Sequence, residues 1–115
     1  MPPTLPVDHW YLLNRLDFLT QAVFNYRQKH QFILETDPEI LANLDAPTMH
    51  DEAFEIALSE ISQIRAEAYH YVRFSVPLLP EATDLFTQIV EIINLLNIQR
   101  SQQRGILELK RLALL

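Results

Sequence analysis

One short stretch of the chain carries the residues whose types and spacing could do chemistry. Glu67 and His70 are three residues apart, and this spacing puts a carboxylate and an imidazole on one face of a helix. Helical bundles that hold two iron ions need two such pairs and two further glutamates, all pointing inward. This chain has one pair, and its other long apolar segments offer only Asp17 and Glu91. We therefore interpret Glu67 and His70 as part of a solvated helix face.

Histidines suggest zinc as a second kind of chemistry. If the first and third predicted helices are antiparallel, His9 comes near Glu67 and His70, and three ligands of these types could hold zinc. The same arrangement brings His30 near His50. Histidines at helix ends are more often ordinary polar residues, so we predict neither a metal nor another cofactor.

Arg65 and His70 also have the spacing Arg-x4-His. In this respect residues 65–70 resemble the short signature of the HEPN ribonucleases. Five residues turn a helix by about 140°, so the resemblance implies that Arg65 and His70 converge across a dimer interface and cleave RNA without metal. The chain departs from the family at Ala66, where a polar residue usually follows the arginine, and the motif lies late in its helix. The alternative is that Arg65 lies beside Tyr69 with its charge in water or paired to an acid.

Several classes of enzyme are disfavoured by what the chain lacks. It has no cysteine, which excludes disulfides, iron–sulfur clusters and thiolate chemistry. Gly105 is its one glycine, and one glycine cannot build a loop that cradles phosphate. No serine has the glycine-bounded elbow of a nucleophile. The sequence therefore favours a non-enzymatic protein.

Charge and composition indicate a globular acidic chain. Of its 115 residues, 49% are hydrophobic and 21% are charged, which suits one folded domain. The net charge of −6 lies within residues 1–80, because residues 81–115 carry four acidic and four basic side chains. An acidic body argues against nonspecific binding of nucleic acid. No signal peptide or apolar run of membrane-spanning length is present, so we expect a cytoplasmic location.

The elements that must position these residues are predicted to be helices, because glycine is nearly absent and the prolines lie at plausible boundaries. We expect an extended arm over residues 1–7 and a single helical domain over residues 8–115. Its helices should cover about 8–31, a short segment after Asp37-Pro38, 49–75, and Pro80 to the end, continuous or kinked at Gly105. The predicted fold class is all-α: a small antiparallel bundle of three long helices and one short one.

The aromatic side chains at helical spacing are predicted to lie in the core. They are Trp10, Tyr11, Phe18, Phe24 and Tyr26 in the first helix, and Tyr69, Tyr71 and Phe74 in the third.

The last helix carries more apolar surface than two neighbours can cover. Residues 85–98 and 106–115 are rich in leucine and isoleucine, and monomers rarely expose large apolar patches. We therefore predict a non-enzymatic protein–protein interaction module, such as a small subunit, adaptor or assembly factor, that forms a homodimer or binds a protein partner. The alternatives are the HEPN-like ribonuclease and a metal-binding bundle. The predicted interface anchors are Leu85, Ile89, Ile92, Ile93, Leu96, Leu107 and Leu112.

Overall fold

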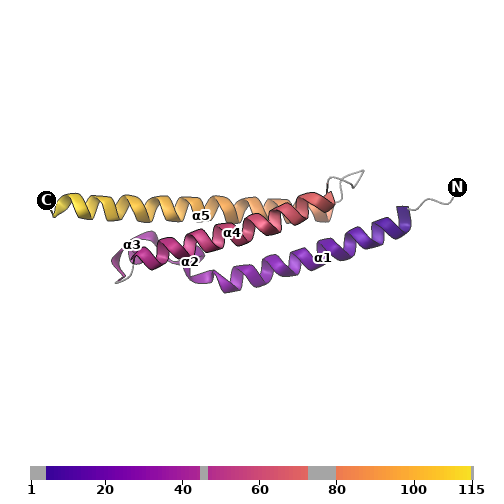
Figure 1. The fold of residues 1–115 in the computed structure, drawn as a ribbon, viewed down its shortest axis with the longest axis horizontal. Coiled ribbons are helices and arrows are strands. Elements are labelled where there is room, and N and C mark those ends of the chain that lie inside the picture. Colours follow the sequence, from indigo (N-terminus) through magenta and orange to yellow (C-terminus); the bar gives the residue numbers. More distant parts are fainter. Residues whose placement is uncertain (1–4, 45–46, 73–79, 115) are drawn as a thin grey trace.

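A computed structural model of the chain describes residues 5–44, 47–72 and 80–114 (Figure 1). The helices are α1 (Leu5–Lys29), α2 (Gln31–Glu35), α3 (Pro38–Asn43), α4 (Pro47–Val72) and α5 (Pro80–Ala113). The described residues contain no strand, so the all-α prediction is confirmed, as are its three long helices. The prediction of one short helix is wrong, because α2 and α3 are separate.

The molecule is long and narrow, measuring 75 × 20 × 17 Å. α1, α4 and α5 lie side by side, and α2 and α3 pack against α4 and α5 (Figure 1). Three contacts fix how α4 meets α5: Asp51 with Arg104, Glu55 with Arg100, and Tyr69 with Phe86. Residue numbers rise along α4 as they fall along α5, so these two helices run in opposite directions. Each end of the molecule is a single overhanging helix, α1 at one end and α5 at the other.

A capping signal explains where α3 begins, whereas α1 begins earlier than predicted. The Asp37 side chain accepts a hydrogen bond from the Glu39 backbone N–H at 2.8 Å, with Pro38 in the first turn. This is the predicted cap. α1 begins at Leu5 and not at Asp8, so residues 5–7 are helical and not part of an extended arm. Proline is tolerated in a first helical turn, where its missing N–H is not needed. Residues 1–4 lie outside the described part.

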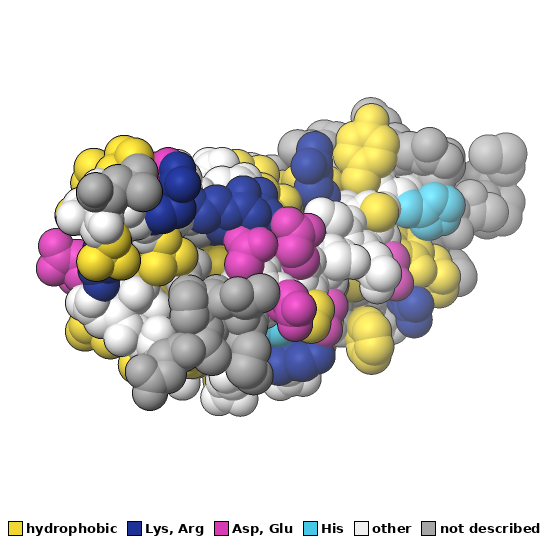
Figure 2. All heavy atoms as spheres, turned by 60° about the vertical axis from the view of Figure 1, so that its left-hand side comes forward, with side chains coloured by type: hydrophobic (Ala, Val, Ile, Leu, Met, Phe, Trp, Pro, Cys, Tyr) yellow, Lys and Arg dark blue, Asp and Glu magenta, His cyan; other side chains and the backbone are white. Residues whose placement is uncertain are grey.

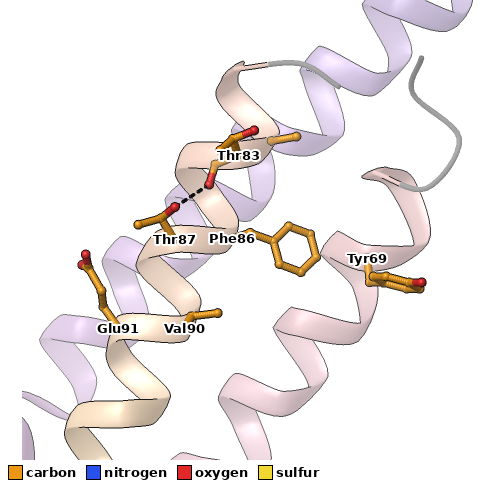
Figure 3. A pocket seen from close by; sticks show the side chains of 7 residues that line it. Tyr69, Thr83, Phe86, Thr87, Val90 and Glu91 are labelled. Atoms are coloured by element: carbon orange, nitrogen blue, oxygen red, sulfur yellow. Dashed lines mark hydrogen bonds between the residues drawn. The ribbon is translucent and has the colours of Figure 1, made fainter. Parts of the chain in front are cut away.

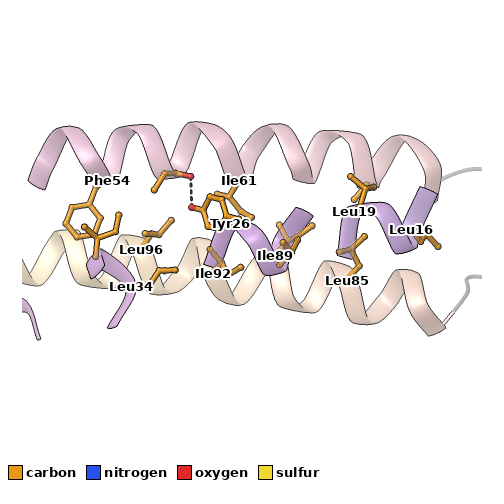
Figure 4. Close-up of a cluster of buried hydrophobic side chains, with 14 of the residues drawn as sticks. Leu16, Leu19, Tyr26, Leu34, Phe54, Ile61, Leu85, Ile89, Ile92 and Leu96 are labelled. Carbon is orange, nitrogen blue, oxygen red and sulfur yellow. Dashed lines mark hydrogen bonds between the residues drawn. The ribbon is translucent and has the colours of Figure 1, made fainter. Parts of the chain in front are cut away.

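The hydrophobic core lies along the line where α1, α4 and α5 meet (Figure 4). α1 contributes Leu16, Leu19, Val23 and Tyr26, and α4 contributes Phe54, Ala57, Ile61 and Ala68. α5 contributes an inner row that faces the other helices. The inner row is Leu85, Ile89, Ile92, Leu96, Gln99 and Gln103. The Tyr26 hydroxyl crosses the core and donates to the Ala57 carbonyl at 2.6 Å.

Gln99 in the inner row fixes the end of α2. Its amide Nε2 donates to the carbonyl of Thr36 at 2.7 Å, and more weakly to those of Ile33 and Leu34 at 3.2 and 3.4 Å. The last carbonyls of a helix lack hydrogen-bond donors within the helix. The buried Gln99 amide donates these missing hydrogen bonds at the end of α2. The next polar member of the row, Gln103, is 1% exposed, and its Nε2 has no hydrogen-bond partner among the residues that the structure describes.

α5 is 34 residues long and includes Gly105 without a break. Of the two alternatives predicted for this helix, continuous or kinked, it is therefore the continuous helix that the structure has. A methyl group added at Gly105 would meet nothing within 4 Å, so no close packing inside the chain requires glycine there.

The predicted burial of the aromatic side chains in α1 is wrong. Trp10, Tyr11, Phe18 and Phe24 are each more than half exposed, and of the predicted set in this helix only Tyr26 is buried. The physical reason is that α1 is covered along one side only, where Leu16, Leu19, Val23 and Tyr26 face α4 and α5. In α4, Tyr69 is also exposed and Tyr71 is half-buried, whereas Phe74 lies outside the described residues.

Candidate functional site

The residues of the predicted chemical sites lie on the exposed surface of α4. Arg65, Glu67 and His70 are all exposed, and the His70 ring packs edge-on against Tyr71 with ring centroids 5.3 Å apart. The side chain of His9, the third predicted zinc ligand, lies outside the described part. Among the side chains that are described, no group of three or more His, Cys, Asp or Glu is arranged to hold a metal ion.

His30 serves a structural role that the sequence did not reveal. It is buried at the break between α1 and α2, and its Nε2 lies 2.7 Å from Glu60 Oε2. Lys29 Nζ lies 2.7 Å from the other oxygen of the same carboxylate. Hydrogen bonds from Lys29 and His30 lower the pKa of Glu60. The three side chains therefore join the end of α1 to the middle of α4. The side chain of His50, its predicted neighbour, is outside the described part.

A cation and several rings line the seam between α1 and α4. Arg15 Nε donates to the Tyr71 hydroxyl at 3.1 Å. The Arg15 guanidinium lies 5.5 Å from the ring centroid of Phe18 and 5.4 Å from that of Tyr71. Tyr11 meets Tyr71 edge-on at 6.1 Å. These contacts hold the aromatic side chains of α1 in place while leaving Tyr11 and Phe18 largely open to solvent.

Most of the predicted interface anchors on α5 lie inside the chain's own core. Leu85, Ile89, Ile92 and Leu96 are at most 1% exposed, because they belong to the inner row. Ile93 and Leu107 are half-buried, and Leu112 is 51% exposed. An interface made by α5 therefore needs a set of residues that does not include these four buried anchors.

Such a set lies on the outward side of α5, which we call the outer stripe. It consists of Leu95, Ile98, Gln102, Gly105, Leu109 and Leu112, all of them exposed. The spacings along it are 3, 4, 3, 4 and 3 residues, which is the pattern of a coiled-coil seam. Leu95, Ile98 and Gln102 each precede a member of the inner row by one residue. One residue turns a helix by about 100°, so α5 presents two rows, one to its own chain and one to solvent.

A groove runs beside the outer stripe where α5 passes the start of α3. Its volume is about 710 Å³, and it is lined by Asp37, Pro38 and Glu39 on one side and by Gln102, Gly105, Ile106 and Leu109 on the other. Figure 2 shows hydrophobic, basic and acidic side chains interspersed at this end of the molecule. The part of the outer stripe from Gln102 to Leu109 therefore forms one side of an open groove.

A second apolar groove, of about 480 Å³, lies at the other end of α5. Tyr69 of α4 points toward Phe86 of α5, and their rings meet edge-on at 6.3 Å (Figure 3). Val90 extends the apolar lining, and Thr87 donates its hydroxyl to the Thr83 carbonyl at 2.9 Å. The rings of Tyr69 and Phe86 and the side chain of Val90 make this groove a surface for apolar contact.

Comparison of the chain with protein family models, with curated proteins and with solved structures finds no significant match. None of the helices among the residues that the structure describes is both long and apolar enough to cross a bilayer.

Proposed function

We propose that this chain is a non-enzymatic helical interaction module, a small subunit, adaptor or assembly factor that docks through the outer stripe of α5. The observation that supports it most is the exposure of four large aliphatic side chains in one regular row. Leu95 is 37% exposed, Ile98 52%, Leu109 68% and Leu112 51%. Single exposed leucines are ordinary on protein surfaces, but a row at coiled-coil spacing is typical of a surface that another helix covers.

The free energy gained by burying the outer stripe is large enough to support association. The exposed fractions of these four side chains add to about two whole side chains. Burying a leucine or isoleucine completely contributes about 1.5–3 kcal/mol, so covering the outer stripe contributes about 3–6 kcal/mol from this chain alone. A partner supplies a similar amount from its own apolar side chains. Association costs about 4–15 kcal/mol in lost freedom, so we expect moderate rather than very tight binding.

The overhanging end of α5 supports the same proposal. α5 extends past α3 and α4 at its C-terminal end (Figure 1), and in its last turns Leu109 is 68% and Leu112 51% exposed. A polar sequence would suffice for a helix end in water, yet this one carries leucine on its outward side. The side chains there therefore suit a helix-in-groove or helix-on-helix contact.

Photo-crosslinking in cells tests this proposal directly. We would place p-benzoylphenylalanine at position 109 in the outer stripe, and at exposed position 63 in α4 as the matched control. We expect discrete protein adducts from position 109 and none from position 63. Absence of adducts at position 109, together with a purely monomeric chain at high micromolar concentration, would contradict the proposed function.

A further inference from the structure

We infer that the outer stripe of α5 binds the outer stripe of a second copy of this chain, with the two α5 helices running in opposite directions. This inference rests on the proposed function and names the partner. It follows from the order of side chains along the stripe, from the overhang of α5, and from the pairing of charges around it.

The order of side chains makes the outer stripe complementary to its own reverse. The stripe has two large aliphatic side chains at each end and the pair Gln102 and Gly105 in the middle. This order of aliphatic and non-aliphatic positions is the same when the stripe is read in the opposite direction. When the helices are opposed and centred between residues 103 and 104, the facing positions are 95 with 112, 98 with 109, and 102 with 105. Leucine and isoleucine thus meet aliphatic partners at both ends, and each Gln102 meets the small Gly105 of the second copy.

The overhang favours opposed helices over parallel ones. Leu109 and Leu112 belong to the last turns of α5, toward the end that extends past the other helices, whereas Leu95 and Ile98 directly precede Leu96 and Gln99, which are buried in the bundle (Figure 1). An opposed pair lays the overhanging end of each copy on the body of the other. A parallel pair would place the two overhanging ends against each other and leave both without a neighbouring bundle.

The charges along this part of α5 do not oppose self-association. Residues 92–99 carry no charged side chain. Beyond them, Arg100 pairs with Glu55 and Arg104 pairs with Asp51, each at 2.7 Å. Glu108 and Arg111 pair with each other, and Lys110 donates to Asn43. The chain has a net charge of −6, which repels a second copy over most of its surface, whereas the charged side chains of α5 beside the outer stripe are paired within the chain.

The length of the seam sets the expected affinity. From residue 95 to residue 112 a helix rises about 26 Å, or roughly two and a half heptads. This is at the small end of specific interfaces, so we expect a dissociation constant in the micromolar range.

Sedimentation of matched variants tests which surface is used. Leu109→Glu buries a carboxylate opposite Ile98 of the second copy, and we expect it to raise the dimer dissociation constant at least about tenfold. Leu114→Glu makes the same chemical change at an 89% exposed side chain outside the stripe, and we expect wild-type dimerisation. Circular dichroism should show the wild-type helix content in both variants. Leu95→Glu repeats the test at the opposite end of the stripe.

Disulfide trapping tests the direction of the helices, because the natural chain has no cysteine. In the opposed pair, positions 98 and 109 of the two copies face each other, while the two copies of position 109 are about 17 Å apart along the helix axis. A mixture of Ile98→Cys and Leu109→Cys chains should therefore form a disulfide-linked dimer, and neither variant should do so alone. Ready linkage of Leu109→Cys to itself would overturn the opposed arrangement.

The outcomes separate this inference from the proposed function. If both Leu109→Glu and Leu95→Glu leave the dimer intact, the two copies do not meet through the outer stripe. The chain would then still be an interaction module, but through another surface. If the chain is a monomer that forms adducts with a different protein at position 109, the inference that the partner is a second copy is wrong. The proposed function is unaffected by that result. A monomer without such adducts overturns both.

Discussion

Two glutamines in the inner row of α5 provide a matched test of how the core is stabilised. Gln99 and Gln103 are both buried and lie four residues apart on the same helix. Gln99 donates to three carbonyls at the end of α2, the shortest contact being 2.7 Å to Thr36. Gln103 is more fully enclosed, yet its Nε2 has no hydrogen-bond partner within the described part of the chain. Replacing each by methionine keeps the length of the side chain and removes the amide.

The two substitutions should change the free energy of unfolding in opposite directions. Gln99→Met leaves buried carbonyls without a donor, which costs about 1–3 kcal/mol. Gln103→Met removes an unsatisfied buried donor and replaces it with an apolar group, so we expect a gain of about 1 kcal/mol. The difference between the variants is then about 2–4 kcal/mol, a large part of the 5–15 kcal/mol typical of a domain.

Denaturant unfolding followed by circular dichroism measures this difference. The measurements should be made in the Leu109→Glu background, so that self-association does not contribute to apparent stability. The denaturant slope should stay the same in both variants if only stability changes. Equal destabilisation of Gln99→Met and Gln103→Met would refute the reasoning, since it would mean that both amides are stabilising in solution.

Three further predictions follow from named residues. Gly105→Ala, made in the same Leu109→Glu background, should stabilise the chain by about 1 kcal/mol in denaturant unfolding, because α5 is helical there and the added methyl group meets nothing within the chain; a loss of stability would show that α5 is broken at this position. The lowered pKa of Glu60 means that its contribution is present above the ordinary value of 4.5 and is lost as the pH falls through the lower, folded-state value. Glu60→Gln should therefore lower the melting temperature at pH 7 and reduce the further loss on acidification; identical pH profiles would contradict this. A labelled single-stranded RNA should remain intact on a gel with wild-type chain; cleavage that His70→Ala abolishes would establish the HEPN-like alternative.

Local signals made much of the fold predictable. The near absence of glycine indicated helices throughout, and Asp37 followed by Pro38 marked the start of α3. The continuity of α5 could be anticipated because the residues on both sides of Gly105 favour helix. α2 could not be anticipated, since its end depends on the amide of Gln99, 63 residues beyond Thr36.

The candidate site was harder to predict, because an apolar pattern does not state how many neighbours a helix has. In α1 the aromatic side chains widen an apolar row that α4 and α5 cover on one side only, so Phe18 and Phe24 stay exposed. In α5 apolar residues surround the helix between 85 and 98. The choice of Leu96 for the core and Leu95 for the surface depends on a one-residue offset, which is decided by packing against α1 and α4 and not by hydrophobicity.

The central claim is that two copies meet through the outer stripe in opposite directions, and the length of the dimer in small-angle X-ray scattering tests it most directly. One chain is 75 Å long, and the proposed two-fold axis lies about 16 Å from the C-terminal end of α5. The opposed dimer should therefore have a maximum dimension of roughly 120 Å. A dimer of about the length of a single chain would show that the copies lie side by side through another surface, and would contradict the claim.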